Sequence, residues 1–377
     1  MDFKNFKIPY SINDKYAKKV AYFSMEFAIE QVLKIYSGGL GFLAGSHMRS
    51  AYNLKQDVVG IGILWKFGYY DQARNHDQTL QPTWTKKMYS FLEDTGIKFQ
   101  IEIHSAPVWV KVWYLAPETF HTAPMFFLST DVPENDHISK TICHKLYDAN
   151  ESTKLAQYIL LGKGGAKLLD ELNIEREVYH LNEAHGLPAA FHLLKKYNGD
   201  LQKVKEKLVF TTHTPEEAGN EKHNLKLCYD MSYFSGLSIE EAKQLEGADG
   251  DLFNHSLCAL KMARVANGVS QLHGVVSRAM WSKYTGICEI KSITNAQEFK
   301  YWGDKELYNA KDENDDTVFD YRKKLLKKRL FKIVADQTGN LFNPDIFTIV
   351  WARRFAGYKR ADLLLHDKDR FYKLLNN

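Results

Sequence analysis

The sequence has few cysteines and no segment that is apolar enough for a membrane span or an export signal. Its 377 residues include four cysteines, and none of them belongs to a CxxC pair. This excludes a disulfide framework and favours reduced, mostly buried thiols. No run approaches the roughly 20 apolar residues of a membrane-spanning helix, and the N-terminal residues lack the apolar core of a secretory signal. We therefore expect a cytoplasmic protein without membrane contact.

The sequence also lacks a large net charge and the common catalytic signatures. With 50 basic and 46 acidic residues the formal net charge is +4, too balanced for a dedicated nucleic-acid-binding protein. The motifs HExxH, GxxxxGK[ST] and GxSxG are absent, which excludes the usual metalloprotease, nucleoside-triphosphatase and serine-hydrolase sites. Aromatic residues make up 13%. Such rings are as typical of packed cores as of carbohydrate sites.

Apolar segments alternate between strand and helix patterns, which predicts an α/β fold. A strand pattern over 19–27 is followed by a glycine-rich loop, a helix pattern and a second apolar strand, and this order is a βαβ unit. Residues 99–131 instead predict successive strands with short turns, as in an antiparallel insert. The alternation resumes after a helix at 151–172. Residues 255–281 are predicted to be mostly helical, with a break near Asn267. We expect a parallel sheet covered by helices on both faces.

A domain boundary is predicted near residue 340. Residues 316–339 have the spacing of a long amphipathic helix whose lysines lie on its solvated face. The segment TGNLFNPD follows and is typical of a junction. We assign residues 1–340 to a first domain. Residues 341–377, with one strand–loop–helix pattern, are assigned to the beginning of a second, incomplete domain.

Three segments place polar or flexible residues at predicted strand ends, where ligands bind in such sheets. They are SGGLG (37–41), HLNEAHGLPAAF (180–191) and VFTTHTPEEAGNEKHN (209–224). Taken alone, each has a structural alternative. The glycines could form a tight turn, Asn182 could cap a helix, and His213 could be a hydrogen-bonded core histidine.

A fourth segment, WARRFAGYKRADLLL (351–365), concentrates cations at a predicted helix start. Arg353, Arg354, Lys359 and Arg360 there oppose the helix dipole. A bound anion would relieve that repulsion, and guanidinium groups bind phosphate oxygens in pairs. This segment therefore predicts a phosphate or a phosphorylated ligand.

In their order along the chain, these segments resemble the glycogen/α-glucan phosphorylase family. The matching motifs are YFSMEF, GGLG, GILWKFGYYDQ, HLNEAHG, FTTHT, ARVANGVSQLHG, SITN and RRFAGYKR, which together span residues 20–365. The compact N-terminal part is similar to the shorter bacterial branch. The resemblance implies a two-domain GT-B glycosyltransferase architecture, with two Rossmann-like domains of which the second is truncated here.

The resemblance also implies an activity and a cofactor. Family members use inorganic phosphate to release terminal glucose from α-1,4-glucans as α-glucose 1-phosphate. They carry pyridoxal 5′-phosphate, whose phosphate group serves as the proton partner. Homodimers are common in the family, and a homodimer is the candidate assembly here. Glucan and phosphate are the expected partners.

The resemblance assigns roles to individual residues. His213, Arg354 and Lys359 are the expected catalytic groups, the last two gripping substrate phosphate, and Arg353 is expected near the cofactor phosphate. Glu26 is a further carboxylate expected to face the site. The expected substrate-binding residues are Gly38, Gly39, Leu40, Gly41, Glu183, His185 and Asn267.

Departures from the family pattern leave alternatives open. Ala296 follows the Asn of SITN where the family has glycine, and AGYKR replaces the usual HEYKR. No residue matches the Schiff-base lysine, so we expect the chain by itself to be inactive. The alternatives are a glycogen or starch synthase that uses a nucleotide sugar, and a noncatalytic glucan-binding fragment.

Overall fold

The computed structural model describes residues 2–247, 250–353 and 357–376. It divides into two units, Met1–Glu298 and Phe299–Asn377. The domain boundary predicted near residue 340 stays a prediction. No helix among the described residues is long and apolar enough to span a bilayer.

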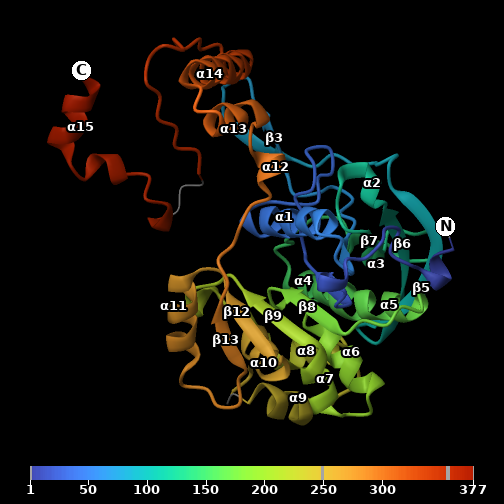
Figure 1. Ribbon diagram of the computed structural model, residues 1–377. Coiled ribbons are helices and arrows are strands. Elements are labelled where there is room, and N and C mark those ends of the chain that lie inside the picture. Colours follow the sequence, from blue (N-terminus) through green and yellow to red (C-terminus); the bar gives the residue numbers. More distant parts are fainter. Residues whose placement is uncertain (1, 248–249, 354–356, 377) are drawn as a thin grey trace. The chain divides into compact units, whose positions relative to one another are not determined.

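A nine-stranded sheet forms the centre of the first unit (Figure 1). In spatial order its strands are β13 (Glu289–Ser292), β12 (Val265–Gly268), β9 (Leu208–Thr212), β8 (Val178–Asn182), β1 (Val20–Phe23), β2 (Val58–Ile63), β7 (Met125–Ser129), β6 (Ala106–Leu115) and β5 (Glu93–Ile103). All neighbours from β13 to β7 pair in parallel, and β7, β6 and β5 pair antiparallel. This confirms the predicted α/β class with a large parallel sheet.

The β-rich segment extends this sheet. Strands β5 and β6 form a long hairpin, and β7 joins it to β2. Val108, Val110 and Val112 of β6 are buried, whereas the alternate residues Trp109, Lys111 and Trp113 are only partly buried. This period of two gives the hairpin one face toward the core and one toward solvent. Two further strand pairs lie outside the sheet, β3 (Asp71–Arg74) with β4 (Leu80–Thr83) and β10 (Lys222–Asn224) with β11 (Leu252–Asn254).

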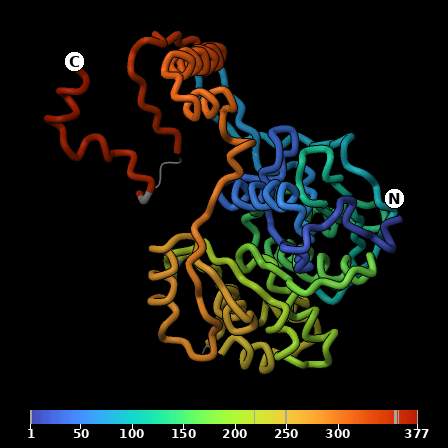
Figure 2. The backbone as a smooth tube through the Cα atoms, viewed as in Figure 1, coloured from blue at the N-terminus to red at the C-terminus, as the bar shows by residue number. Residues whose placement is uncertain are grey.

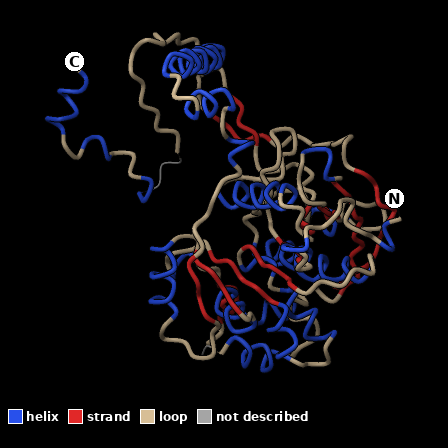
Figure 3. The backbone as a smooth tube through the Cα atoms, viewed as in Figure 1, coloured by secondary structure: helices blue, strands red, loops and turns tan. Residues whose placement is uncertain are grey.

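Helices connect the parallel strands, and Figure 3 shows the alternation in blue and red. The helices of this unit are α1 (Gly39–Asn53), α2 (Pro117–Phe120), α3 (His137–Thr141), α4 (Glu151–Ile159), α5 (Gly165–Glu171), α6 (Pro188–Lys196), α7 (Leu201–Lys207), α8 (Leu225–Asp230), α9 (Ile239–Glu246), α10 (His255–Met262) and α11 (Gln271–Trp281). The predicted break at Asn267 is the strand β12, which separates α10 from α11.

The predicted helix at 151–172 is continuous through its glycines. Its middle turn, Leu160–Gly164, is a π-helical turn between α4 and α5. A Cβ on Gly162 would lie 2.6 Å from the carbonyl oxygen of Gly186. A glycine at 162 therefore lets this helix approach the turn that follows β8. That turn is the end of the motif HLNEAHG and leads into helix α6.

The second unit is helical among its described residues. It contains α12 (Phe299–Trp302), α13 (Lys305–Asp312), α14 (Asp316–Thr338) and α15 (Lys368–Leu375), with short 3₁₀ turns at Gly357–Lys359 and Leu363–Leu365. Helix α14 confirms the long helix predicted over 316–339. Figure 2 follows the chain into this part in orange and red. The strand predicted before residue 352 is not formed in residues 341–353. A strand needs a hydrogen-bonding neighbour, and no other described residue of this unit is in a strand.

Candidate active site

A cavity of about 240 Å³ lies at the carboxyl edge of the parallel sheet in the first unit. It opens where β8 and β9 end, and three of the predicted motifs contribute to its wall. Leu40 comes from the glycine-rich loop, Glu183 and His185 follow β8, and His213 follows β9. Because the carboxyl ends of parallel strands meet at one edge, segments distant in sequence converge there.

His213 is held by the end of the neighbouring strand. Its Nε2 lies 2.7 Å from Oδ1 of Asn182, and Nδ2 of Asn182 donates to the hydroxyl of Ser24 at 3.1 Å. Since the amide nitrogen is used toward Ser24, Oδ1 accepts, and the Nε2–H of His213 donates. Burial lowers the pKa of His213 to about 4. The imidazole is therefore neutral near pH 7, with Nδ1 as an acceptor.

Glu183 is a buried carboxylate at the edge of the cavity. One oxygen accepts the backbone N–H of His213 at 2.5 Å and the hydroxyl of Thr214 at 3.2 Å. Burial raises the pKa of Glu183 to about 7, although these hydrogen bonds oppose the shift. A carboxyl group with such a pKa exists in both protonation states near neutral pH.

The backbone of Glu183 is unusual. Its φ is 67° and its ψ is 169°, a region that residues with a Cβ rarely adopt. Such conformations persist where the surrounding structure imposes them, and they concentrate at functional sites. Here the conformation turns the chain from β8 into the 3₁₀ turn Ala184–Gly186. The capping role considered for Asn182 is not observed, because its side chain bonds Ser24 and His213.

His185 lies between two tyrosines and near a second carboxylate. Its ring centroid is 5.0 Å from that of Tyr158 and 6.0 Å from that of Tyr147. The Tyr158 hydroxyl donates to Glu221, which also lies 3.3 Å from the Lys154 ammonium. Burial raises the pKa of Glu221, but the His185 ring, the Tyr158 hydroxyl and Lys154 outweigh burial, so the net shift is downward. Glu221 is thus held as a carboxylate.

The first amides of the glycine-rich loop bind a carboxylate of the protein itself, that of Glu26. Oε2 of Glu26 accepts the backbone N–H groups of Ser37 at 2.6 Å and Gly38 at 3.0 Å. Oε1 accepts the hydroxyl of Tyr147 at 2.7 Å. This places a carboxylate at the N-terminus of α1, where the helix dipole favours negative charge. The next amides, those of residues 39–41, have no hydrogen-bond partner within the described part of the chain.

Comparison with known proteins adds evidence for the family. No family model matches the chain. Over 95% of its length it is 46% identical to an uncharacterized protein, MJ1631, of Methanocaldococcus jannaschii, and covers 68% of that protein. It is 30% identical to the maltodextrin phosphorylase of Thermococcus litoralis and 26% to the glycogen phosphorylase of Aquifex aeolicus, over 96% and 97% of the chain. The chain belongs to the glycogen/α-glucan phosphorylase family.

The chain covers only part of its phosphorylase relatives. It spans 50% of the Thermococcus protein and 61% of the Aquifex protein. The mixed α/β structure with its large parallel sheet is consistent with the Rossmann-like GT-B fold of the phosphorylase family.

The structure brings four of the eight predicted sugar-side residues to the cavity and leaves the three glycines of the loop and Asn267 outside its lining. Leu40, Glu183, His185 and His213 line the cavity, whereas Asn267 does not. Its Oδ1 accepts the hydroxyl of Thr211 at 2.7 Å, inside the sheet. The assignment of Asn267 to a sugar hydroxyl stays a prediction.

The predicted phosphate-binding residues belong to the second unit. Arg353 and Lys359 line one hollow there, together with Arg360. Arg354 lies outside the described residues. The roles predicted for all three cations stay predictions.

Sequence reasoning did not single out Tyr147, Tyr158, Glu221 or His255. Glu221 lies within the motif that follows β9, but nothing in its spacing distinguishes it from Glu216 or Glu217. Tyr158 sits on a helix whose apolar pattern predicts a core residue. His255 forms hydrogen bonds with Nδ1 of His223 and with the hydroxyl of Tyr233, each at 2.8 Å. It also lines the cavity. Only the fold brings these residues to one place.

Proposed function

We propose that the chain supplies the sugar-binding wall of an α-1,4-glucan phosphorylase. In the whole protein this enzyme would transfer terminal glucose from glycogen or maltodextrin to inorganic phosphate and release α-glucose 1-phosphate. The observation that carries the proposal is the cavity itself, because the glycine-rich loop, the segment after β8 and the segment after β9 converge on it. The family membership supplies the reaction class.

The side chains of the cavity suit a neutral, hydroxyl-rich ligand. The neutral ring of His213 presents an acceptor, while the paired carboxylate of Glu221 and the carboxyl group of Glu183 present further acceptors. The amides of residues 39–41, which have no partner among the described residues, are donors, and Leu40 lines the cavity. Sugar hydroxyls both donate and accept, so such a mixed set can orient them. His213, Glu183 and His185 would then contact substrate.

We propose that phosphate does not bind at the first amides of the glycine-rich loop. The amides of Ser37 and Gly38 are already bonded to Glu26, and a second anion at the same atoms would be repelled. The cations of the segment 353–360 fit a phosphate group in charge and hydrogen-bonding capacity. Arg354 and Lys359 are the residues that we propose for substrate phosphate, and Arg353 for the cofactor phosphate.

The cofactor proposed for the whole protein is pyridoxal 5′-phosphate. The arginines and the single lysine of the segment 353–360 fit its phosphate group in charge. When bound, it supplies a phosphate group that exchanges a proton with substrate phosphate. No residue of this chain is assigned to its aldehyde. The residues described here bind and orient the sugar and hold protons at Glu183 and at Nε2 of His213.

Two measurements test the proposal. The full-length protein that carries this sequence should release glucose 1-phosphate from maltoheptaose and phosphate, whereas transfer from a nucleotide sugar would favour the synthase alternative. Isothermal titration calorimetry of the 377-residue chain with maltoheptaose should show binding that His213→Ala weakens at least tenfold. Unweakened binding would show that His213 does not contact the glucan. Loss of folding would show that His213 is a structural core residue.

In the same full-length protein Arg354→Ala should mainly weaken the use of phosphate, by about 2 kcal/mol, because a charge-assisted contact is lost. An unchanged dependence of the rate on phosphate concentration would refute this assignment.

A further inference from the structure

Tyr147 combines a strained backbone with a hydrogen bond to a buried carboxylate. Its φ is 59°, in the left-handed region that bulky side chains rarely adopt. Its hydroxyl donates to Oε1 of Glu26 at 2.7 Å, whereas the Ser37 hydroxyl is 3.4 Å from the same oxygen. Backbone strain of this kind persists where surrounding contacts impose it, and it concentrates at functional sites. The contacts that impose it lie on both sides of Tyr147.

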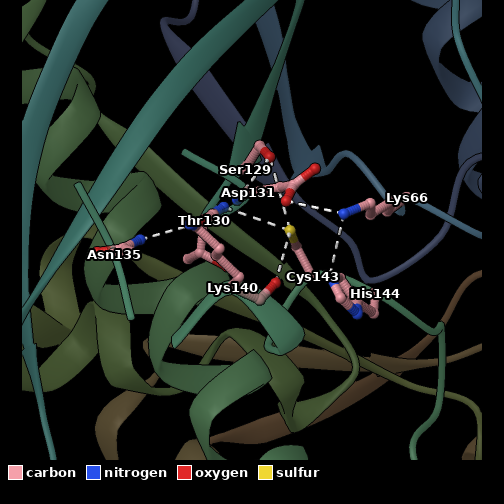
Figure 4. Close-up of polar contacts among 8 residues, drawn as sticks. All are labelled: Lys66, Ser129, Thr130, Asp131, Asn135, Lys140, Cys143 and His144. Atoms are coloured by element: carbon pink, nitrogen blue, oxygen red, sulfur yellow. Dashed lines mark hydrogen bonds and ion pairs between the residues drawn. The ribbon is translucent and has the colours of Figure 1, made fainter. Parts of the chain in front are cut away.

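The segment before Tyr147 is anchored to strand ends of the sheet (Figure 4). Sγ of Cys143 accepts the backbone N–H of Thr130, which follows β7, at 3.3 Å. The backbone N–H of Lys66, which follows β2, donates to the carbonyl of Cys143 at 2.9 Å. Nζ of Lys66 also lies 3.5 Å from Nε2 of His144. These bonds tie residues 143–144 to the carboxyl ends of two neighbouring parallel strands.

Further hydrogen bonds fix the residues next to Tyr147. Nε2 of Gln157, on α4, donates to the carbonyl of Lys145 at 2.9 Å. The backbone N–H of Leu146 donates to the carbonyl of Gly68 at 3.0 Å. Helix α4 then begins with a side-chain N-cap. A chain that is held on both sides cannot relax the φ of Tyr147 without breaking such bonds, so the direction of this side chain is fixed.

The hydroxyl of Tyr147 orients the carboxylate that holds the glycine-rich loop. Glu26 is 2% exposed. Its Oε2 accepts the amides of Ser37 and Gly38, while its Oε1 accepts the Tyr147 hydroxyl. The carboxylate thus has one oxygen on the loop and one on Tyr147, and rotation away from either breaks a charge-assisted hydrogen bond. Because Leu40 lines the candidate active site, the position of this part of the cavity wall depends on the carboxylate.

The ring of Tyr147 makes a separate contact with the cavity wall. Its centroid is 6.0 Å from that of His185, although Tyr147 itself is not among the lining residues. Burial, together with the neighbouring carboxylate of Glu26, raises the pKa of Tyr147 well above its ordinary value. The hydroxyl therefore remains a donor near neutral pH. Tyr147 can act on a ligand through Glu26 and His185, and not by direct contact.

We propose that Tyr147 is a positioning residue for the candidate active site and acts through Glu26 on the glycine-rich loop. It holds the carboxylate against the amides of residues 37 and 38, which leaves the amides of residues 39–41 for the ligand. That the ligand is an α-glucan rests on the proposed function, whereas the action on the loop rests on the hydrogen bonds. Phosphate use should be unaffected, because the cations proposed for phosphate belong to the second unit.

Tyr147→Phe tests the proposal, because it removes the hydroxyl and keeps the ring beside His185. In the 377-residue chain, hydrogen–deuterium exchange of the Ser37 and Gly38 amides should become about fivefold faster. The calorimetric affinity for maltoheptaose should fall about tenfold. The matched control is Tyr114→Phe, since the Tyr114 hydroxyl is buried and has no partner among the described residues. It should change neither quantity more than twofold.

Kinetics of the full-length protein distinguish positioning from a general loss of structure. Tyr147→Phe should raise the KM for maltoheptaose about tenfold and change the KM for phosphate less than twofold. A variant that is merely less well folded loses active protein, which lowers the apparent kcat and leaves both KM values in place. An equal rise of the two KM values, or a fall in kcat alone, would overturn the proposal.

A double-mutant cycle shows whether Tyr147 acts through Glu26. Glu26→Ala removes the carboxylate, so adding Tyr147→Phe to it should weaken maltoheptaose binding less than twofold. Losses that multiply would mean that Tyr147 acts independently of Glu26, which contradicts the proposal. If circular dichroism shows that Glu26→Ala does not fold, Glu26→Gln replaces it. Its single amide oxygen can accept from the loop or from the Tyr147 hydroxyl, and the same lack of additivity is expected.

The outcomes separate this proposal from the proposed function. If Tyr147→Phe leaves the loop exchange and the affinity unchanged while His213→Ala weakens binding, the positioning role fails and the proposed function stands. Faster loop exchange with unchanged affinity also overturns the role, because the loop would then not serve binding. If the unmodified chain binds no maltoheptaose, the proposed function fails, and the role of Tyr147 in sugar binding fails with it.

Discussion

Oε2 of Glu26 occupies the space that a side chain on Gly41 would need. A Cβ at position 41 would lie 2.7 Å from this oxygen. The same carboxylate bonds the two amides that precede helix α1. Glu26 and Gly41 therefore form one packing unit, in which the absence of a side chain at 41 lets the carboxylate hold the loop.

Gly41→Ala should therefore disturb the loop, whereas Gly39→Ala should not. We expect Gly41→Ala to lower the free energy of unfolding by about 1–3 kcal/mol, because an added methyl group overpacks a filled site. A Cβ on Gly39 would meet no atom within 4 Å, so Gly39→Ala is the matched control for stability. Thermal unfolding of both variants measures the difference. Equal melting temperatures would contradict the packing argument.

The raised pKa of Glu183 predicts a specific pH dependence of stability. The folded protein holds this proton more tightly than the unfolded chain, in which the pKa of Glu183 is near the ordinary glutamate value of 4.5. The contribution of the protonated Glu183 to the free energy of unfolding is therefore fully present below pH 4.5. It is lost as the pH rises from there through about 7. The loss is on the order of 3 kcal/mol. Glu183→Gln should remove this decline, because an amide does not titrate.

Urea denaturation of the original chain and of Glu183→Gln at several pH values between 4 and 8 measures this effect. The difference in unfolding free energy between the two should grow in favour of the variant as the pH rises. A difference that stays constant with pH would show that Glu183 titrates normally.

Removal of two tyrosine hydroxyls should have different effects on stability. Tyr158 donates to the carboxylate of Glu221, so Tyr158→Phe should cost about 1 kcal/mol by leaving a half-buried carboxylate with one donor fewer. The hydroxyl of Tyr114 is buried and has no hydrogen-bond partner among the described residues. Tyr114→Phe should therefore leave stability unchanged or raise it slightly. Melting temperatures decide the comparison, and a reversed order would be inconsistent with the hydrogen-bond assignments.

A buried ion pair far from the candidate site provides a stability prediction independent of function. Arg176 precedes β8 and pairs with Asp57, which precedes β2, and their side chains are 5% and 13% exposed. Arg176→Met should cost about 3–5 kcal/mol, because it leaves the Asp57 carboxylate buried and unpaired. The double variant Arg176→Met with Asp57→Leu should recover part of this loss. A double-mutant cycle from urea denaturation measures the coupling, and purely additive losses would argue against the pair.

Local patterns were sufficient for the elements that depend on near neighbours. The 3.6-residue spacing from 316 to 339 predicts a helix, and α14 (Asp316–Thr338) is that helix. The pattern over 99–131 predicts successive strands with short turns, and β6 is one of these strands. By contrast, β12 was missed, because a four-residue strand between two helices becomes a strand only through pairing with β9 and β13. The apolar run before residue 352 shows the converse, since no other described residue of its unit is in a strand with which it could pair.

The sequence by itself determined the α/β class, the order of the motifs and the family, because these depend on residue types and their spacing along the chain. It also named Glu183, His185 and His213 as residues that follow strands. Only the tertiary structure decided that Glu26 accepts hydrogen bonds from the amides of the glycine-rich loop. It also decided that Tyr158 and Glu221 line the cavity and that Asn267 does not. These contacts join residues 11 to 63 positions apart. Local spacing carries no information about such pairs, and the register of the parallel strands creates them.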